Sequence, residues 1–342
     1  MAQIGFVRSS RKDEQRVALL PSHLGAIRRV DELLFERGYA DHLGYSDDDY
    51  LREGARVADR AQVCACPIIC CPKPLLSDEY FREGVVLFGW VHAVQNQPVT
   101  DRLVELQMTA VAWEDMFERG RHCFWRNNEI AGEAAIPHAC LQWGRLPYEC
   151  RAALIGCGNV GRGALRALER YGCHVTVYDR KTSPRLREEV QHYDLIVNAV
   201  LWDVFRTDRL LYEEDLDRMR PGSLIIDISC DPHMGIETSR ATTIAEPVYW
   251  HRGILHYAVD HTPTLFFRSA SESIGQQVAC FADALIQGTH GPVLENATII
   301  RGGWIRDERI LRFQNRTNRQ ELWDAQTEGV TPLLRGTVPA VM

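Results

Sequence analysis

The three glycines Gly156, Gly158 and Gly161 have the spacing G-x-G-x-x-G between an apolar segment and a run with helical periodicity. In a strand, turn and helix of this kind, the first glycine permits the tight turn and the second lets a pyrophosphate approach the backbone. The third lets the helix pack closely on the strand, and free N–H groups at the helix start hold the phosphates. A second apolar segment ends at Asp179, 23 positions after Gly156. The complete unit predicts a dinucleotide-binding site rather than a structural glycine turn.

The residues around this turn predict how the nucleotide is held. Asn159 and Val160 lie between the second and third glycines and are expected at the phosphate-binding start of the helix. An acid after the second strand accepts a hydrogen bond from a ribose 2′-hydroxyl and repels a 2′-phosphate, so Asp179 favours NAD. Arg180 and Lys181 follow directly and could pair with a 2′-phosphate if Asp179 points away. The residues alone leave both cofactors open.

Four titratable residues are expected at the carboxyl ends of predicted strands, where open α/β sheets bind their ligands. They are Lys73, His92, Glu114 and Asp260. Chemistry between an amine and an imine needs proton donors and acceptors, and a lysine near another cation or a histidine titrates closer to neutrality. A substrate carboxylate also needs a cation, and Arg16 can bind one through two parallel N–H bonds. From spacing alone, a lone histidine or lysine is more often an ordinary surface group than a catalytic one.

Alternating strand and helix patterns must position these residues. Strands are expected at 3–7, 68–71, 85–91, 110–113, 193–200, 223–228 and 255–259, and helices at 99–108, 127–143 and 269–287. A further helix is expected after Pro21, where an apolar stripe runs to Leu34, while residues 230–249 have a loop-like composition. Two prolines fix the backbone around Lys73 as extended. The alternation predicts an α/β protein with two doubly wound parallel-sheet domains.

The composition is that of an ordinary globular protein. The 342 residues are 45% hydrophobic and 25% charged, with a formal net charge of −7, which disfavours a nucleic-acid surface. No apolar run approaches the roughly 20 residues that cross a bilayer, and the N-terminus lacks the layout of a signal peptide. We therefore expect a cytoplasmic protein whose partners are small molecules rather than nucleic acid or membrane.

Eleven cysteines are scattered at no disulfide-framework spacing, which predicts reduced thiols. Four of them crowd together, at Cys64, Cys66, Cys70 and Cys71. Isoleucines interrupt this cluster, and no second ligand pair follows at the spacing of a zinc site. We expect these thiols in the core and no bound metal.

Several segments resemble the alanine dehydrogenase and saccharopine dehydrogenase family. The segment Glu14–Pro21 is similar to the family's E-x-R-V-A-L-x-P stretch, whose arginine binds the substrate carboxylate. Pro72–Pro74 resembles the segment with its active-site lysine, and residues 87–92 resemble the strand that delivers its active-site histidine. Residues 258–265 resemble its V-D-x-x-P segment, whose aspartate is catalytic in alanine dehydrogenases.

Two further segments extend the resemblance. Residues 112–115 are similar to the short strand that leaves the first domain in this family, and residues 127–135 look most like the branch that forms carboxyethylornithine. The resemblance implies a Rossmann dinucleotide-binding domain, residues 129–285, inserted in a discontinuous catalytic domain. That domain would comprise residues 1–128 and be completed by residues 286–320, with a possible tail at 321–342.

The same resemblance implies roles and a reaction. Lys73, His92 and Asp260 would be catalytic, whereas Arg16 and Glu114 would bind substrate, in a homo-oligomer. The implied reaction condenses pyruvate, an α-keto acid, with the side-chain amine of ornithine through an imine, giving N5-(1-carboxyethyl)ornithine. That branch uses NADPH, so the resemblance favours NADP without excluding NAD. Two other functions stay compatible, an alanine or saccharopine dehydrogenase proper and a catalytically inactive nucleotide-binding relative.

Overall fold

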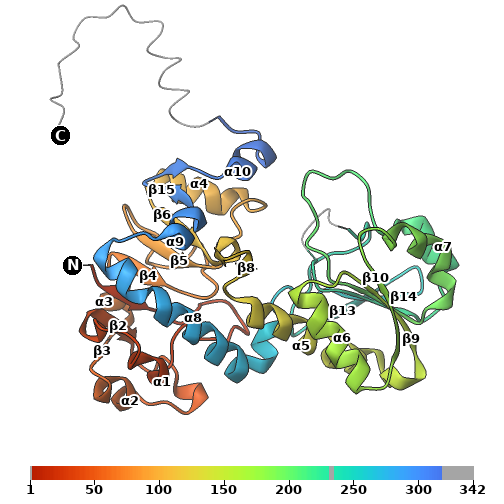
Figure 1. Ribbon diagram of the computed structural model, residues 1–342, viewed down its shortest axis with the longest axis horizontal. Coiled ribbons are helices and arrows are strands. Elements are labelled where there is room, and N and C mark those ends of the chain that lie inside the picture. The colour runs from red at the N-terminus through yellow and green to blue at the C-terminus, as the bar shows by residue number, and fades with distance from the viewer. Residues whose placement is uncertain (1, 231–234, 318–342) are drawn as a thin grey trace, which may run out of the picture.

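The computed structural model describes residues 2–230 and 235–317, which form two α/β bodies, each built on one mainly parallel sheet (Figure 1). The helices α5 (Trp125–Trp143) and α8 (Phe267–Gln287) run between the two bodies. The expected two-sheet α/β fold is therefore confirmed. The possible tail at 321–342 lies outside the described residues.

The first sheet has eight strands in the order β16-β15-β6-β5-β4-β1-β2-β3. Their bounds are β1 Ile4–Phe6, β2 Leu33–Glu36, β3 Arg56–Ala58, β4 Ile68–Cys70, β5 Val86–Gly89, β6 Thr109–Ala112, β15 Thr298–Arg301 and β16 Trp304–Ile305. Strands β1 to β6 are mutually parallel, whereas β15 pairs antiparallel with β6. Chain from the C-terminal region thus completes the sheet begun by the N-terminal half.

Short helices cover this sheet. They are α1 Pro21–Leu24, α2 Asp47–Arg52, α3 Arg60–Cys64, α4 Gln97–Glu105, α9 Pro292–Ala297 and α10 Glu308–Phe313, with single turns η1 Val30–Glu32, η2 Asp41–Leu43 and η3 Trp113–Asp115. A two-stranded hairpin, β7 Phe117–Glu118 with β8 Arg121–His122, stands apart from the sheet. The prediction of a long helix after Pro21 was wrong. Helix α1 ends at Leu24, and the apolar residues from Leu33 form strand β2, whose residues are all buried.

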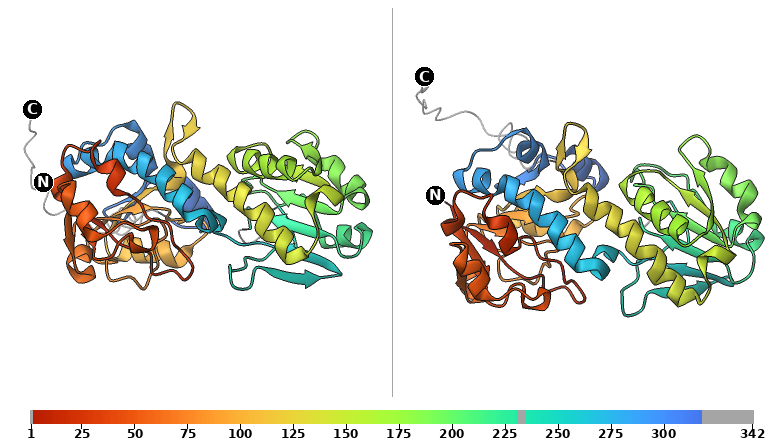
Figure 2. Two further views of the ribbon diagram at one scale, coloured as in Figure 1. Left: turned by 90° about the horizontal axis from the view of Figure 1, so that it is seen from below. Right: turned by 60° about the horizontal axis from the view of Figure 1, so that its bottom comes forward.

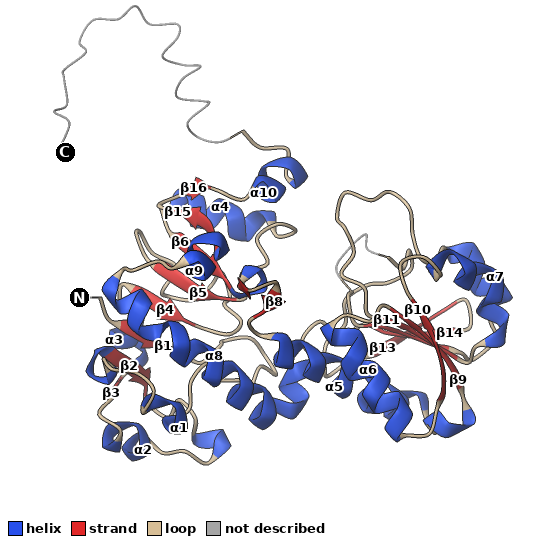
Figure 3. Cartoon of the chain, in the orientation of Figure 1, coloured by secondary structure: helices blue, strands red, loops and turns tan. Residues whose placement is uncertain are grey.

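The second sheet has six strands in the order β10-β9-β11-β12-β14-β13 (Figure 3). Their bounds are β9 Arg151–Ile155, β10 His174–Tyr178, β11 Leu195–Asn198, β12 Leu224–Asp227, β13 Val248–His251 and β14 Ile254–Tyr257. Helices α6 (Asn159–Arg170) and α7 (Leu186–Glu189) follow β9 and β10, and the turns are η4 Pro147–Glu149, η5 Ser183–Arg185, η6 Val190–His192, η7 Glu213–Arg218 and η8 Thr262–Phe266. Strand β13, antiparallel to β14, begins inside the segment expected to be a loop.

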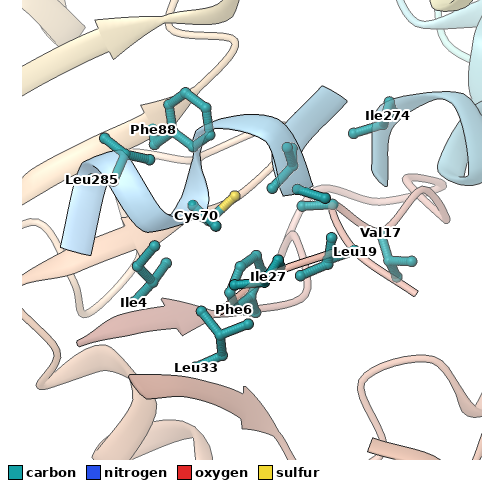
Figure 4. Packing of buried hydrophobic residues seen from close by; sticks show 14 of the residues in the cluster. Ile4, Phe6, Val17, Leu19, Ile27, Leu33, Cys70, Phe88, Ile274 and Leu285 are labelled. Carbon is teal, nitrogen blue, oxygen red and sulfur yellow. The ribbon is translucent and has the colours of Figure 1, made fainter. Parts of the chain in front are cut away.

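Helix α8 packs by its apolar face against the first sheet. Ile274 and Leu285 of this helix lie in one core cluster with Ile4, Phe6 and Phe88 from the strands (Figure 4). The sequence-based boundary at 285/286 assigns α8 to the nucleotide-binding domain, but its packing joins it to the first domain. The expected buried strand at 68–71 is present as β4, and the four clustered thiols lie in the core.

Helix α5 is held closely against α6 of the second body (Figure 2). A Cβ on Gly132 would overlap the carbonyl oxygen of Val160, and one on Gly163 would overlap that of Glu129, so both positions need glycine for this crossing. Within α5, Arg126 and Glu133 form an ion pair at 2.9 Å. In the described ranges, no helix is long and apolar enough to span a bilayer.

Candidate active site

The carboxyl ends of neighbouring strands bring the N-terminal candidates together. Strand β5 lies between β4 and β6, with Cys70 paired to Phe88 and Gly89 paired to Ala112. Lys73 follows β4, His92 follows β5, and Glu114 follows β6, each within three residues of the strand end. Parallel strands end at one edge of a sheet, so the three side chains are neighbours although they are distant in sequence.

Lys73 and His92 influence each other directly. Loss of hydration lowers the pKa of the Lys73 amine, and the charges of Arg11 and Arg16 lower it further, whereas Asp260 raises it. The charge of Lys73 is the main reason that the pKa of His92 lies well below its ordinary value, and His92 itself remains open to solvent. Neither the Lys73 amine nor the His92 ring has a hydrogen-bond partner among the described residues. Near neutral pH the site therefore presents a neutral imidazole beside a lysine whose affinity for its proton is reduced.

Glu114 is placed differently from its expected role in substrate binding. Its Oε1 accepts the backbone N–H of His92 at 2.5 Å, and its Oε2 accepts that of Val91 at 3.2 Å. His92 has a φ of 50°, in the left-handed region that non-glycine residues seldom adopt without support. Both carboxylate oxygens of Glu114 thus stabilise the turn that presents the His92 ring, which makes Glu114 a positioning residue.

The Glu114 carboxyl predicts a pH-dependent contribution to stability. Burial raises its pKa from 4.5 to about 7, so the folded protein binds this proton more tightly than the unfolded chain. The contribution is complete below about pH 4.5 and is lost as the pH rises through 7. We expect the wild type to lose about 2 kcal/mol more than Glu114→Gln between pH 5 and pH 8, measured by urea unfolding. Glu118→Gln, an exposed control, should keep the wild-type dependence; equal curves for all three proteins would contradict the assignment.

Arg16 is oriented by two neighbours. Its Nε donates to Glu14 Oε1 at 2.7 Å, its Nη2 to Glu14 Oε2 at 2.5 Å, and its Nη1 to Asn127 Oδ1 at 3.1 Å. Burial would raise the pKa of the Glu14 carboxyl, but the charge and hydrogen bonds of Arg16 hold it below its ordinary value. The guanidinium, which lies 5.0 Å from the ring centroid of Trp90, carries five N–H donors. Three are used here, so one on Nη1 and one on Nη2 remain to bind a carboxylate end-on.

Asp260 enters this group from the second body. It follows β14 by three residues, and Arg11 Nη2 donates to its Oδ1 at 2.7 Å and its Oδ2 at 2.6 Å. The adjacent His261 ring contacts Oδ1 through Nδ1 at 2.6 Å. Burial would raise the pKa of Asp260, but His261, Lys73 and Arg11 hold it well below its ordinary value. Asp260 is therefore an ionised carboxylate that faces the lysine across the two domains.

The glycine turn has the geometry that a dinucleotide needs. Gly156 has a φ of 94°, and a Cβ on Gly161 would overlap the carbonyl oxygen of Gly156. A Cβ on Gly158 would meet no atom within 4 Å, so the backbone there faces open space. Helix α6 begins at Asn159 without a side-chain cap, which leaves the first N–H groups, including that of Val160, without helical partners. This open, uncapped turn fits a pyrophosphate.

The residues that follow β10, Asp179 to Lys181, influence whether NAD or NADP fits the site. Asp179 Oδ1 accepts the backbone N–H groups of Lys181 at 2.9 Å and Thr182 at 2.8 Å, and the Thr182 hydroxyl at 2.8 Å. One carboxylate oxygen is thus used within its own turn. Arg180 and Lys181 are exposed beside it. The arrangement leaves room for either a ribose hydroxyl or a 2′-phosphate.

A cavity of about 590 Å³ joins the two bodies near this turn. It is lined by the hairpin residues Phe117 and His122 on one side and by Asn159 and Arg162 of α6 on the other, with Glu129 between them.

Several residues of the group were not predicted from the sequence. Glu14 and Arg11 lie in a polar loop. The spacing E-x-R at 14–16 could have indicated that Glu14 binds Arg16, but no pattern in the sequence indicated the contact of Arg11. The helix expected at 127–143 begins at Trp125, and the Asn127 side chain accepts a hydrogen bond from Arg16. Thr264 fixes the loop by accepting from Gln15 N–H at 2.8 Å. The contacts of Arg11, Asn127 and Thr264 join segments that are distant in sequence, whereas Glu14 contacts Arg16 two residues away.

The fold and the site together define a two-domain dehydrogenase that uses a nicotinamide cofactor. Two family models match the chain: "Alanine dehydrogenase/PNT, N-terminal domain" over residues 5–124 and "Alanine dehydrogenase/PNT, C-terminal domain" over residues 180–312. The chain belongs to the alanine dehydrogenase/PNT family. As a member it is an oxidoreductase acting on CH–NH groups, and its C-terminal family domain binds NAD(P).

Curated relatives give a finer comparison. The chain is 30% identical to the N(5)-(carboxyethyl)ornithine synthase of Clostridium botulinum, covering 80% of this chain and 92% of that protein. It is 29% identical to the synthase of the same name from Lactococcus lactis, with the same coverage. The alanine dehydrogenase of Halomonas elongata is 28% identical over 83% of this chain and 87% of its own length.

Solved structures agree on the fold. An L-alanine dehydrogenase superposes with a TM-score of 0.76 at 20% identity, covering 92% of this chain and 99% of that chain. A transhydrogenase from Sinorhizobium meliloti superposes with a TM-score of 0.73 at 18% identity, covering 88% and 99%. At these identities the likeness establishes the architecture alone.

Proposed function

We propose that the chain catalyses the NAD(P)H-dependent reductive condensation of an α-keto acid, with pyruvate as the first candidate, and the side-chain amine of ornithine. The product is N5-(1-carboxyethyl)ornithine, and water leaves. The observation that carries the proposal is the electrostatic contact of Lys73 and His92 with Arg16 from the first body and Asp260 from the second, which also carries the open glycine turn. The similarity to two carboxyethylornithine synthases supports ornithine as the amine.

Each side chain has a role that its surroundings allow. Arg16, held by Glu14 and Asn127, offers its two remaining N–H donors to the carboxylate of the keto acid. Lys73, whose amine has a lowered pKa, donates to the keto oxygen as the carbon–nitrogen bond forms. That oxygen takes up two protons and leaves as water, which gives the imine.

The remaining groups hold charge and protons around the imine. Asp260, an ionised carboxylate, stabilises the positive charge of the protonated imine. His92 stays neutral beside Lys73, so it acts as a hydrogen-bond partner and proton acceptor rather than as a permanent cation. Gly156, Gly158 and Gly161 would hold a nicotinamide cofactor, which would supply the hydride for reduction of the imine carbon. We propose NADP as the cofactor, supported by the exposed Arg180 and Lys181 and by the use of Asp179 Oδ1 within its own turn.

A direct assay tests this function. Purified protein is mixed with NADPH or NADH, pyruvate, and ornithine, lysine or ammonia, while loss of reduced nicotinamide absorbance and product mass are recorded. We expect fastest turnover with NADPH and ornithine and a product carrying both carbon skeletons. Turnover with ammonia but not ornithine would identify an alanine dehydrogenase, the function named for other relatives. Nicotinamide binding without turnover for any pair would identify a nucleotide-binding relative.

A further inference from the structure

Arg11 is a second arginine in the group, and its surroundings differ from those of Arg16. Arg16 is buried, and three of its donors are fixed by Glu14 and Asn127. The side chain of Arg11 is 26% exposed and contacts Asp260 through Nη2 alone, at 2.6 and 2.7 Å. Its Nε and Nη1 have no hydrogen-bond partner in the part of the chain that the structure describes. Two donor nitrogens of Arg11, Nε and Nη1, are therefore not engaged by the described residues.

The position of Arg11 is defined from both sides. The loop that carries it is held by Ser9, whose Oγ accepts the backbone N–H of Arg11 at 3.2 Å and donates to the carbonyl oxygen of Lys73. The guanidinium of Arg11 is held by Asp260, which lies 249 residues away in sequence. The charge of Arg11 lowers the pKa of both Lys73 and His92, which places its guanidinium within electrostatic reach of the reacting groups.

The proposed reaction brings together two carboxylates, one from the keto acid and one from the amino acid. Two like charges in a partly buried site each need a cation. Arg16 serves the keto acid, and Lys73 is engaged in proton transfer, which leaves one carboxylate without a partner. Condensation with ammonia would bring only one carboxylate and would need only one such arginine.

From this juxtaposition we infer that Arg11 binds the α-carboxylate of the amino-acid substrate and thereby selects an amine that carries a carboxylate over a simple amine or ammonia. The inference rests on the proposed function and deepens it. Arg11 offers the N–H donors of Nε and Nη1 to the incoming carboxylate, because both Asp260 oxygens contact Nη2. Asp260 keeps its contacts with Arg11 Nη2 and with His261 Nδ1 while the substrate carboxylate is bound.

Kinetics with two matched amines tests this inference. Ornithine and 1,4-diaminobutane carry the same reacting amine, but the second lacks the carboxylate. For Arg11→Gln we expect kcat/KM for ornithine to fall roughly 10- to 100-fold, mostly through KM, because a charge-assisted carboxylate contact is lost. The ratio of kcat/KM for ornithine to that for 1,4-diaminobutane should fall by the same factor, because the effect of Arg11 on the pKa of Lys73 and His92 acts on both amines alike. Arg11→Lys, which keeps the charge, should recover part of the ornithine preference.

Lys12→Gln is the matched control, since Lys12 is the exposed neighbour of Arg11 on the same loop and should leave all constants near wild type. An equal loss for both amines in Arg11→Gln would overturn the inference and assign Arg11 to the orientation of Asp260. Calorimetric titration of ornithine into the NADP-loaded protein gives an answer independent of turnover. Binding retained in Arg11→Gln refutes the role of Arg11 while the proposed function stands. Wild-type protein that neither binds nor turns over ornithine refutes both.

Discussion

Replacing Lys73 by methionine is expected to lower kcat roughly 10²- to 10⁴-fold, the usual contribution of a positioned acid or base. The structure gives Lys73 an amine without a hydrogen-bond partner among the described residues, next to His92 and opposite Asp260. Methionine has a similar length but no proton to transfer. Folding should be unaffected, as thermal unfolding will show, and nicotinamide affinity should remain near wild type. Lys12→Met, on an exposed loop residue, provides the control.

A second substitution separates proton transfer from simple attraction at this position. An arginine at position 73 would keep the positive charge of Lys73. Arginine does not lose its proton in proteins, so Lys73→Arg should be nearly as inactive as Lys73→Met. The wild-type pH profile should show a limb below the ordinary lysine pKa of 10.5, and both variants should lack it. Substantial activity in Lys73→Arg would show that charge alone suffices.

Replacing Gly158 by alanine is expected to weaken nicotinamide binding without destabilising the free protein. The added methyl group meets no protein atom within 4 Å, so the fold accommodates it. It would occupy the space through which the pyrophosphate approaches the backbone. A steric cost of about 1–3 kcal/mol corresponds to a loss of roughly 10- to 100-fold in affinity. Fluorescence titration with NADPH and NADH measures the change, and thermal unfolding checks the fold.

Two further glycines make this prediction specific. Gly25→Ala is the matched control, because Gly25 has a φ of −60° and also faces open space, but far from the turn in sequence. It should leave both cofactor affinity and stability near wild type. Gly161→Ala should instead destabilise the protein, because its Cβ would overlap the carbonyl oxygen of Gly156. If Gly158→Ala binds NADPH and NADH as tightly as wild type, the phosphates do not lie at this turn.

Local patterns in the sequence were sufficient for much of the fold. The glycine spacing, the strand before it and Asp179 after it specify one compact unit, since each residue acts through its immediate backbone neighbours. Long helices were also predictable: the run 269–287 has apolar residues on one face, and the structure has α8 at 267–287. Strand β4 and the first three residues of β11 are continuously apolar because parallel sheets are buried on both faces.

The same principle explains the failure between Pro21 and Leu34. A short apolar run that is buried on both faces fits a helical stripe as well as a strand, and periodicity cannot distinguish the two. The pairing of Leu33 and Leu34 with Ile4 and Gly5 decides in favour of β2. Likewise, α8 joins the first domain because Ile274 and Leu285 fill that core, a choice that depends on which sheet lies nearby.

The sequence by itself determined which residues could do chemistry, because Lys73, His92, Asp260 and the glycine turn each follow a recognisable strand. Only the tertiary structure decided how they act. It turned Glu114 into a support for His92, placed Glu14 and Asn127 around Arg16, and set Arg11 against Asp260. The reason is physical: a strand end is fixed by local periodicity, whereas a hydrogen bond between loops 249 residues apart exists only once two domains have met.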